Sequence, residues 1–200
     1  QAVCRKYGIL IIADEVLVGS GRTGTFFASE PQGLEPDILV LGKGINGGYA
    51  PLSVVMVKNS HLKEIQRGSG SFLHAQTYLQ APCMTIAGVA VLEYMEKHHL
   101  LDHAAKMGDL LQRKLQEVIA PLSQVGSING KGLLAGIEFV DDKKTKAPFQ
   151  RTKKTAEGLA AKAFEIGFTL WPNVGHVDGN NGDLVLIGPP LIIMPREIED

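Results

Sequence analysis

The stretch Asp37-Ile-Leu-Val-Leu-Gly-Lys-Gly-Ile-Asn-Gly-Gly-Tyr-Ala-Pro51 decides how the chain folds. The run from Ile38 to Leu41 is apolar without polar alternation, which is typical of a strand buried on both faces. Lys43 follows this strand between two glycines, so a flat ligand would find no side chain beside it. Ligands bind open α/β sheets beyond the carboxyl ends of the strands. Lys43 is therefore a candidate Schiff-base nucleophile, although a surface lysine in a glycine turn would show the same pattern.

A second apolar run, Ile9-Leu-Ile-Ile-Ala13, ends at Asp14 and predicts another buried strand. The segment between the two runs is long enough for a parallel crossover, which would bring Asp14 and Lys43 to one edge of the sheet. A carboxylate beside a lysine suits pyridoxal phosphate. The lysine binds the aldehyde of this cofactor, and the carboxylate keeps the pyridine nitrogen protonated. A third strand over Ser53–Val57 should be antiparallel, because the link before it is short.

Farther along, hydrophobic periodicity and turn residues predict helices and short strands. The expected helices cover residues 62–66, 85–98, 100–119 and 155–166, and the expected strands cover residues 133–140, 168–171 and 184–187. A change in composition after the helix over 100–119 marks a second region. The resulting domains are residues 1–110 and 111–200.

Several motifs occur in order along nearly the whole chain. They are Ile11-Ile-Ala-Asp-Glu-Val16, Gly21-Arg-Thr-Gly24, Glu35-Pro-Asp-Ile38, Leu41-Gly-Lys-Gly44, His74-Ala-Gln-Thr-Tyr78, Gly130-Lys-Gly-Leu-Leu-Ala-Gly-Ile-Glu138 and Pro189-Pro-Leu191. Together they resemble the class III pyridoxal-phosphate aminotransferases. The resemblance implies an α/β fold of the fold-type I transferases. The chain would contribute the C-terminal portion of the large, mostly parallel-sheet domain and a small α+β C-terminal domain.

The resemblance also implies roles for five residues. Lys43 would carry pyridoxal 5'-phosphate as a Schiff base, Asp14 would pair with the pyridinium nitrogen, and Val16 would pack under the ring. Thr77, beside Gln76, would reach the cofactor phosphate of a neighbouring subunit, which implies a homodimer with shared active sites. Simpler interpretations remain for two of these residues, because Val16 would look the same in an ordinary core and Thr77 before a helix would look like a cap.

Three positions depart from the family pattern. Leu17 stands where many members carry a glutamine that contacts the ring hydroxyl. Leu186 and Asn129 stand where arginines are common, and the first of those arginines clamps a substrate carboxylate. The implied reaction moves an amino group between an amine or amino-acid donor and a keto-acid or aldehyde acceptor, with the substrate class open. The alternatives are an aminomutase or decarboxylase on the same fold, or a silent truncated paralogue that acts as an interaction unit.

Composition and cysteine count argue against nucleic-acid binding, a membrane span, a disulfide framework and a metal site. The net charge of −1 gives no electrostatic footprint for nucleic acid, and no run approaches the ~20 apolar residues of a membrane helix. Cys4 and Cys83 do not form a disulfide framework, which favours a reducing, cytoplasmic location. We expect no metal site, because His99-Leu-Leu-Asp-His103 lacks a convincing third ligand. The acidic loop before Pro189 also lacks the closing glutamate of a calcium site.

Both ends of the sequence predict a fragment. Gln1 to Gly8 is typical of the tail of a helix, and Pro195 to Asp200 of a first helical turn. The resemblance matches about the second half of class III enzymes, so organelle targeting stays open. The family's glycine-rich phosphate-binding turn and its ring-stacking aromatic residue lie upstream of Ile9. We therefore expect these 200 residues alone to be inactive.

Overall fold

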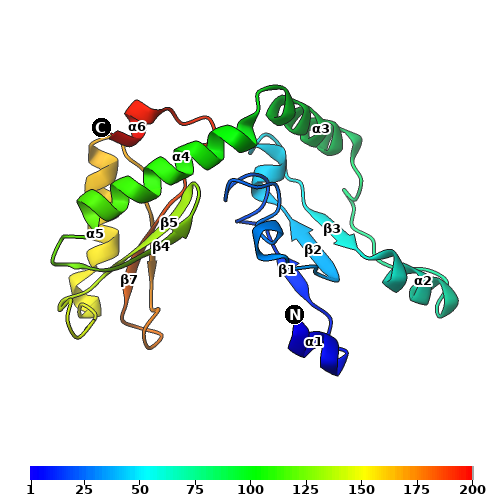
Figure 1. Ribbon diagram of the computed structural model, residues 1–200, viewed down its shortest axis with the longest axis horizontal. Helices are drawn as coiled ribbons and strands as arrows, with labels where there is room; N and C mark the ends of the chain where they lie inside the picture. Colours follow the sequence, from blue (N-terminus) through cyan, green and yellow to red (C-terminus); the bar gives the residue numbers. More distant parts are fainter. Residues whose placement is uncertain (200) are drawn as a thin grey trace. The chain divides into compact units, whose positions relative to one another are not determined.

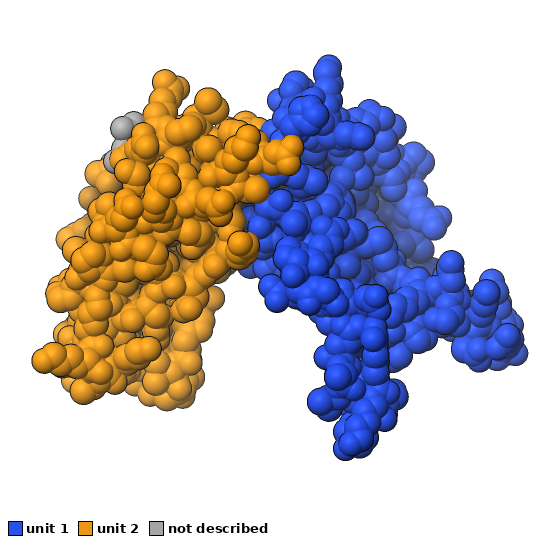
Figure 2. Space-filling view, viewed as in Figure 1, with its two compact units in different colours: residues 1–101 blue, residues 102–200 orange. Residues whose placement is uncertain are grey.

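The strands among the described residues form two separate sheets (Figure 1). The computed structural model describes residues 1–199, and the chain divides into two units, Gln1–Leu101 and Asp102–Asp200, which Figure 2 shows in different colours. Each unit contains one of the sheets. The domains expected at residues 1–110 and 111–200 stay a prediction. Within residues 1–199, no helix has both the length and the apolar character needed to cross a membrane.

The first sheet has the strand order β1-β2-β3. Strand β1 (Ile12–Asp14) pairs in parallel with β2 (Ile38–Leu41), and β2 pairs antiparallel with β3 (Val54–Val57). Both predicted strand directions are confirmed. The short helices of this unit are α1 (Ala2–Tyr7), η1 (Glu30–Gln32), η2 (Lys43–Asn46) and α2 (Asn59–Arg67), and the long one is α3 (Pro82–Lys97).

Only one face of β2 is fully buried, which differs from the expectation of burial on both faces. Leu39 and Leu41 are buried against Ile45, whereas Ile38 and Val40 on the opposite face are half-buried. In β1, Ile12 is 61% exposed. The physical reason is that the described residues pack a hydrophobic cluster against one side of this three-stranded sheet and leave the other side largely uncovered.

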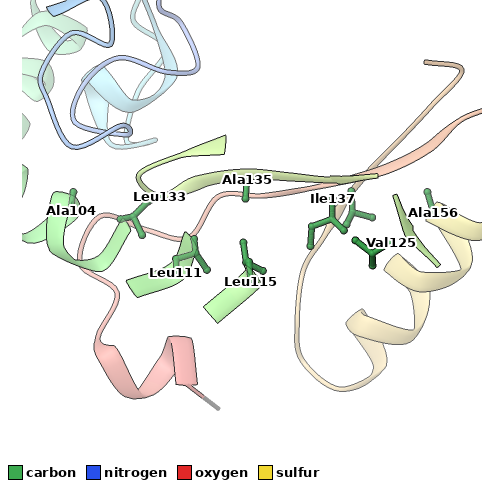
Figure 3. Close-up of a cluster of buried hydrophobic side chains, with 9 residues drawn as sticks. Ala104, Leu111, Leu115, Val125, Leu133, Ala135, Ile137 and Ala156 are labelled. Atoms are coloured by element: carbon green, nitrogen blue, oxygen red, sulfur yellow. The ribbon is translucent and has the colours of Figure 1, made fainter. Parts of the chain in front are cut away.

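The second sheet is antiparallel throughout, in the order β4-β5-β7-β6. Its strands are β4 (Val125–Lys131), β5 (Leu134–Phe139), β6 (Trp171–Val174) and β7 (Asp183–Ile187). The helices are α4 (Leu100–Lys114), which continues into the π-helical turn η3 (Leu115–Ile119), then η4 (Arg151–Lys153), α5 (Thr155–Glu165) and α6 (Pro195–Glu199). Figure 3 shows the core between the helices and this sheet, with Ala104, Leu111 and Leu115 facing Leu133, Ala135 and Ile137.

Two strands of the second sheet were predicted incorrectly. Strand β4, with the sequence Val-Gly-Ser-Ile-Asn-Gly-Lys, was not expected, because its glycines and polar residues hide the strand pattern. Strand β6 lies at Trp171–Val174 instead of residues 168–171, so the expected loop over residues 172–182 is shorter. Each of these strands pairs with the strand that follows it in the sequence, β4 with β5 across a short turn and β6 with β7 across a longer loop. The hairpin hydrogen bonds therefore form strands that the side-chain pattern does not reveal.

Helix α4 approaches the β4–β5 turn so closely that it requires a glycine at position 108. A β-carbon added to Gly108 would lie 2.4 Å from Cα of Gly132, far inside van der Waals contact. Gln112, one turn along the helix, donates through Nε2 to the carbonyl oxygens of Gly132 (2.9 Å) and Leu134 (3.1 Å). The helix and the hairpin are therefore fixed to each other at this point.

This contact predicts opposite effects for two glycine-to-alanine substitutions in helices. Gly108→Ala should destabilise the protein by roughly 1–3 kcal/mol, because the backbone of Gly132 cannot move away as a flexible side chain would. Gly158→Ala in α5 is the matched control, since a β-carbon there meets nothing within 4 Å. It should stabilise by about 0.5–1 kcal/mol through helix propensity. Urea unfolding of the two variants measures the change in the free energy of unfolding for each. Equal changes would contradict a close contact at Gly108.

Asp37 forms hydrogen bonds at the edge of the first sheet where β1 and β2 begin. Its Oδ2 accepts a hydrogen bond from the backbone N–H of Ile11 (2.9 Å), and its Oδ1 accepts one from Nζ of Lys58 (3.0 Å). His61 also lies near Oδ1, at 3.4 Å. The backbone hydrogen bond from Ile11, followed by the one from Lys58, lowers the pKa of Asp37 to about 2. The ionised carboxylate thus links the start of β1 to the segment after β3.

Because the folded pKa of Asp37 lies below its ordinary value, ionised Asp37 stabilises the fold above about pH 4, and this stabilisation is lost as the pH falls toward 2. Asp37→Asn should therefore lower the urea midpoint at pH 7. The gap between the wild type and the variant should narrow as the pH is lowered from about 5 to about 2. Chemical denaturation across this range measures the gap, and a gap independent of pH would show that the charge contributes nothing.

Candidate active site

The carboxyl ends of β1 and β2 bring two of the predicted site residues to one edge of the first sheet. Asp14 is the last residue of β1 and lies opposite Val40 in the parallel register. Lys43 comes three residues after Val40, just beyond the end of β2. Both Asp14 and Lys43 are exposed. The edge therefore presents a carboxylate and an amine on neighbouring strands, which is where ligands bind in sheets of this kind.

The carboxylate and the amine do not neutralise each other. Oδ1 of Asp14 accepts a hydrogen bond from the backbone N–H of Val16 at 3.1 Å. Within residues 1–199, no ion pair of 4.0 Å or less joins Asp14 to Lys43, and Nζ of Lys43 has no hydrogen-bond partner. A ligand could therefore bind both residues at once, with a cationic nitrogen at the carboxylate of Asp14 and an electrophilic carbon at the amine of Lys43.

Lys43 has an unusual backbone conformation. Its φ angle is +44°, in the left-handed region that residues with a β-carbon rarely adopt, and it begins the short 3₁₀ helix η2. Strained backbone of this kind concentrates at functional sites, because only a surrounding structure that fixes the conformation can maintain it. The backbone conformation thus marks Lys43 as a candidate functional residue independently of its side-chain chemistry.

A glycine-rich loop packs closely against the lysine segment. A β-carbon added to Gly42 would lie 3.2 Å from Cγ1 of Val16, and one added to Gly44 would lie 3.4 Å from Cβ of Ser20. On the side where a β-carbon would stand, Val16 and Ser20 of the loop therefore occupy the space next to these glycines. The approach of a flat ligand beside Lys43 stays a prediction. The contact also places the half-buried Val16 directly against the residue before Lys43.

Glu15 anchors this loop, a role that sequence reasoning missed. Its side chain is buried, and its carboxylate accepts hydrogen bonds from the backbone N–H groups of Ala28 (2.6 Å) and Ser29 (2.9 Å). Successive residues of an extended chain point to opposite sides, so Asp14 faces solvent while Glu15 faces the loop. The adjacent acidic pair at a strand end was the available signal, but the partners lie 13 and 14 residues away.

Thr77 and Gln76 lie in the exposed segment between α2 and α3. Helix α3 has Ala81 as its N-cap residue, so Thr77 is not the cap that the simpler interpretation required. Among residues 1–199, no hydrogen bond connects either side chain to Asp14 or Lys43. The described hydrogen bonds therefore do not link Thr77 and Gln76 to the other predicted site residues.

The two positions that depart from arginine lie in one row of the second sheet. Asn129 of β4 and Leu186 of β7 both pair with Gly136 of β5, from opposite sides. Nδ2 of Asn129 donates to Oγ of Ser127 at 3.1 Å. Neither side chain carries a positive charge, so this row offers no bidentate cation to a carboxylate. Leu17, the third departure, is 44% exposed beside Val16.

Comparison with known proteins identifies the family. The family model for class-III aminotransferases matches residues 1–199. The chain is 40% identical to the uncharacterized aminotransferase YodT of Bacillus subtilis, over 99% of this chain and 45% of that protein. It thus spans about half the length of the curated relatives that it matches.

Solved structures agree with this match. A transaminase obtained by ancestral reconstruction superposes with a TM-score of 0.91 at 35% identity, over 100% of this chain and 43% of that one. An amine transaminase from an uncultivated Pseudomonas species, solved in its PLP-bound form, gives a TM-score of 0.89 at 33% identity, over 99% of this chain and 44% of that one. These matches confirm the predicted fold class, a part of a fold-type I transferase. The chain belongs to the class-III aminotransferase family.

Proposed function

We propose that this chain is part of a pyridoxal-phosphate enzyme that transfers an amino group from an amine or amino acid to a keto acid or aldehyde. Membership of the class-III aminotransferase family supports the reaction class. The observation that carries the proposal is the parallel register of β1 and β2. It puts Asp14 and Lys43 at one sheet edge with no ion pair between them in the described chain.

The residues at this edge fit pyridoxal phosphate. The amine of Lys43 has the chemistry to bind the aldehyde, and the carboxylate of Asp14 has the chemistry to pair with the ring nitrogen. Val16, half-buried two residues after Asp14, would pack against the ring. Thr77 and Gln76, exposed and outside this edge, would contact the phosphate bound by the other subunit of a homodimer.

When bound, pyridoxal phosphate supplies an electron sink for the substrate carbon that bears the amine. Asp14 would hold a proton on the ring nitrogen, because an ionised carboxylate only accepts hydrogen bonds. Once the substrate amine has replaced Lys43 on the aldehyde carbon of the cofactor, the amine of Lys43 would be free. Its Nζ would then accept the proton from the amine-bearing carbon of the substrate and deliver it to that cofactor carbon. The loop anchored by Glu15 would keep Val16 in position.

The residues at the positions of the family's arginines bear on how a substrate carboxylate would be bound. Leu186 and Asn129 give no cation at the row opposite Gly136, so we infer that substrate carboxylates are not clamped there. Leu17 would leave the ring hydroxyl without a side-chain hydrogen bond. An aminomutase or decarboxylase would use the same Lys43 and Asp14, but the names of the matched relatives favour amino transfer.

The proposal also covers the oligomeric state, the substrates and the cellular location of the enzyme. A homodimer would supply Thr77 to the partner's site, and small-molecule amines and keto acids would be its substrates. Cys4 and Cys83 are both free thiols, which fits a cytoplasmic location.

The proposal predicts that reductive trapping with borohydride attaches the cofactor to Lys43 in the intact protein. Peptide mapping should find the label on the peptide that contains Lys43, and Lys43→Ala should abolish both the label and amino transfer. Lys58→Ala and Lys63→Ala are the matched controls and should keep the label. A label on Lys58 or Lys63 would instead overturn the assignment.

A further inference from the structure

We propose that Asn46 is a positioning residue for Lys43, because it clamps the turn that keeps the lysine backbone in the left-handed conformation. The inference rests on the proposed function in assigning the chemistry to Lys43. The clamp and the strained backbone are features of the described residues and do not depend on that assignment.

The conformation of Lys43 requires an external restraint. A φ angle of +44° is unfavourable for a residue with a β-carbon, and glycine is the residue that adopts it freely. Gly42 and Gly44 flank Lys43, so glycine is present on both sides of the strained position but not at it. The strained conformation therefore persists only if neighbouring contacts fix it.

The turn itself is too short to provide that restraint. Helix η2 contains four residues, with a backbone hydrogen bond from Ile45 N–H to Gly42 O at 3.1 Å and another from Gly47 N–H to Gly44 O at 3.0 Å. A single helical turn is unfavourable to form, because it fixes several residues for few hydrogen bonds. The stability of η2 must come from side chains that tie it to the rest of the protein.

Asn46, the last residue of η2, provides such a tie. It is 1% exposed, and its Nδ2 donates to the carbonyl oxygen of Ala50 at 2.7 Å. Its own carbonyl oxygen accepts a hydrogen bond from Tyr49 N–H at 2.9 Å. The side chain and main chain of Asn46 thus hold the end of the turn to the loop that follows. Its Oδ1 has no partner among residues 1–199, so the bond to Ala50 is the side chain's single described hydrogen bond.

The opposite side of the turn is already fixed by packing. Ile45 is buried in the cluster with Leu39 and Leu41, and Ser20 packs against Gly44. Helix α3 also lies against the end of η2, since a β-carbon added to Gly47 would lie 3.3 Å from Cγ2 of Val91. To this packing Asn46 adds the described side-chain hydrogen bond that ties the end of the turn to the following loop. Removal of the amide would let the turn unwind and the backbone at Lys43 relax, which would displace the amine.

The clamp is tested by hydrogen–deuterium exchange over residues 42–50 in the intact protein without cofactor. Lys43→Gly and Lys43→Ala both remove the amine, but only glycine removes the strain. With Asn46 present, the glycine variant should protect these amides about tenfold more than the alanine variant. With Asn46→Ala added to both, that advantage should fall to about twofold or less. An equal advantage in both backgrounds would overturn the clamp.

Amino transfer by the cofactor-loaded enzyme tests the positioning role. Asn46→Ala should lower kcat about tenfold or more with KM for the amine donor changed less than about twofold, because the amine is misplaced while substrate binding is kept. Asn59→Ala, at an exposed asparagine, is the matched control and should leave kcat unchanged. An unchanged kcat in Asn46→Ala would overturn the positioning role. Loss of the borohydride label from Lys43 in the wild type would instead contradict the proposed function, while the exchange result would stand.

Discussion

The parallel pairing of β1 with β2 is the constraint on which the candidate site depends. Backbone hydrogen bonds extend the pairing beyond both ends of the strands. The N–H groups of Asp37 and Ile38 donate to Ile11 O before the strands, and Glu15 N–H donates to Val40 O at 2.9 Å after them. A shift of one residue would turn every side chain of β1 to the opposite face. Asp14 would then point toward the loop and Glu15 toward solvent, so the register decides which carboxylate is offered to a ligand.

The same register gives the two adjacent acidic residues different roles, a structural one for Glu15 and exposure at the sheet edge for Asp14. Glu15 uses its buried carboxylate to hold the loop at Ala28 and Ser29, and Asp14 beside it remains exposed. The loop then packs against the glycines on either side of Lys43. The lysine turn thus contacts the loop through Val16 and Ser20 and the hydrophobic cluster through Ile45, while Lys43 itself stays exposed. A strained lysine backbone requires restraints of this kind, to which the hydrogen bond from Asn46 to Ala50 adds another.

The sequence predicted those features that depend on local pattern. The apolar runs before Asp14 and Lys43 identified both strands and their common edge, and the short link to Val54 identified the antiparallel third strand. Features that depend on distant partners were missed. Glu15 is explained only by N–H groups 13 and 14 residues away. The contacts of Val16 and Ser20 with the glycines beside Lys43 were missed because they too join residues distant in sequence. Strand β4 was missed for a different reason, because it pairs with the neighbouring β5 but its glycines and polar residues hide the strand pattern.

The central claim is that Asp14 and Lys43 act on the two ends of one cofactor, and Asp14→Asn tests it most directly. The amide matches the carboxylate in size but cannot hold the ring nitrogen protonated. The intact variant should still bind pyridoxal phosphate through Lys43, seen in its visible absorption, yet lose at least about a hundredfold in kcat for amino transfer. Near-normal turnover by a variant that binds cofactor normally would contradict the account.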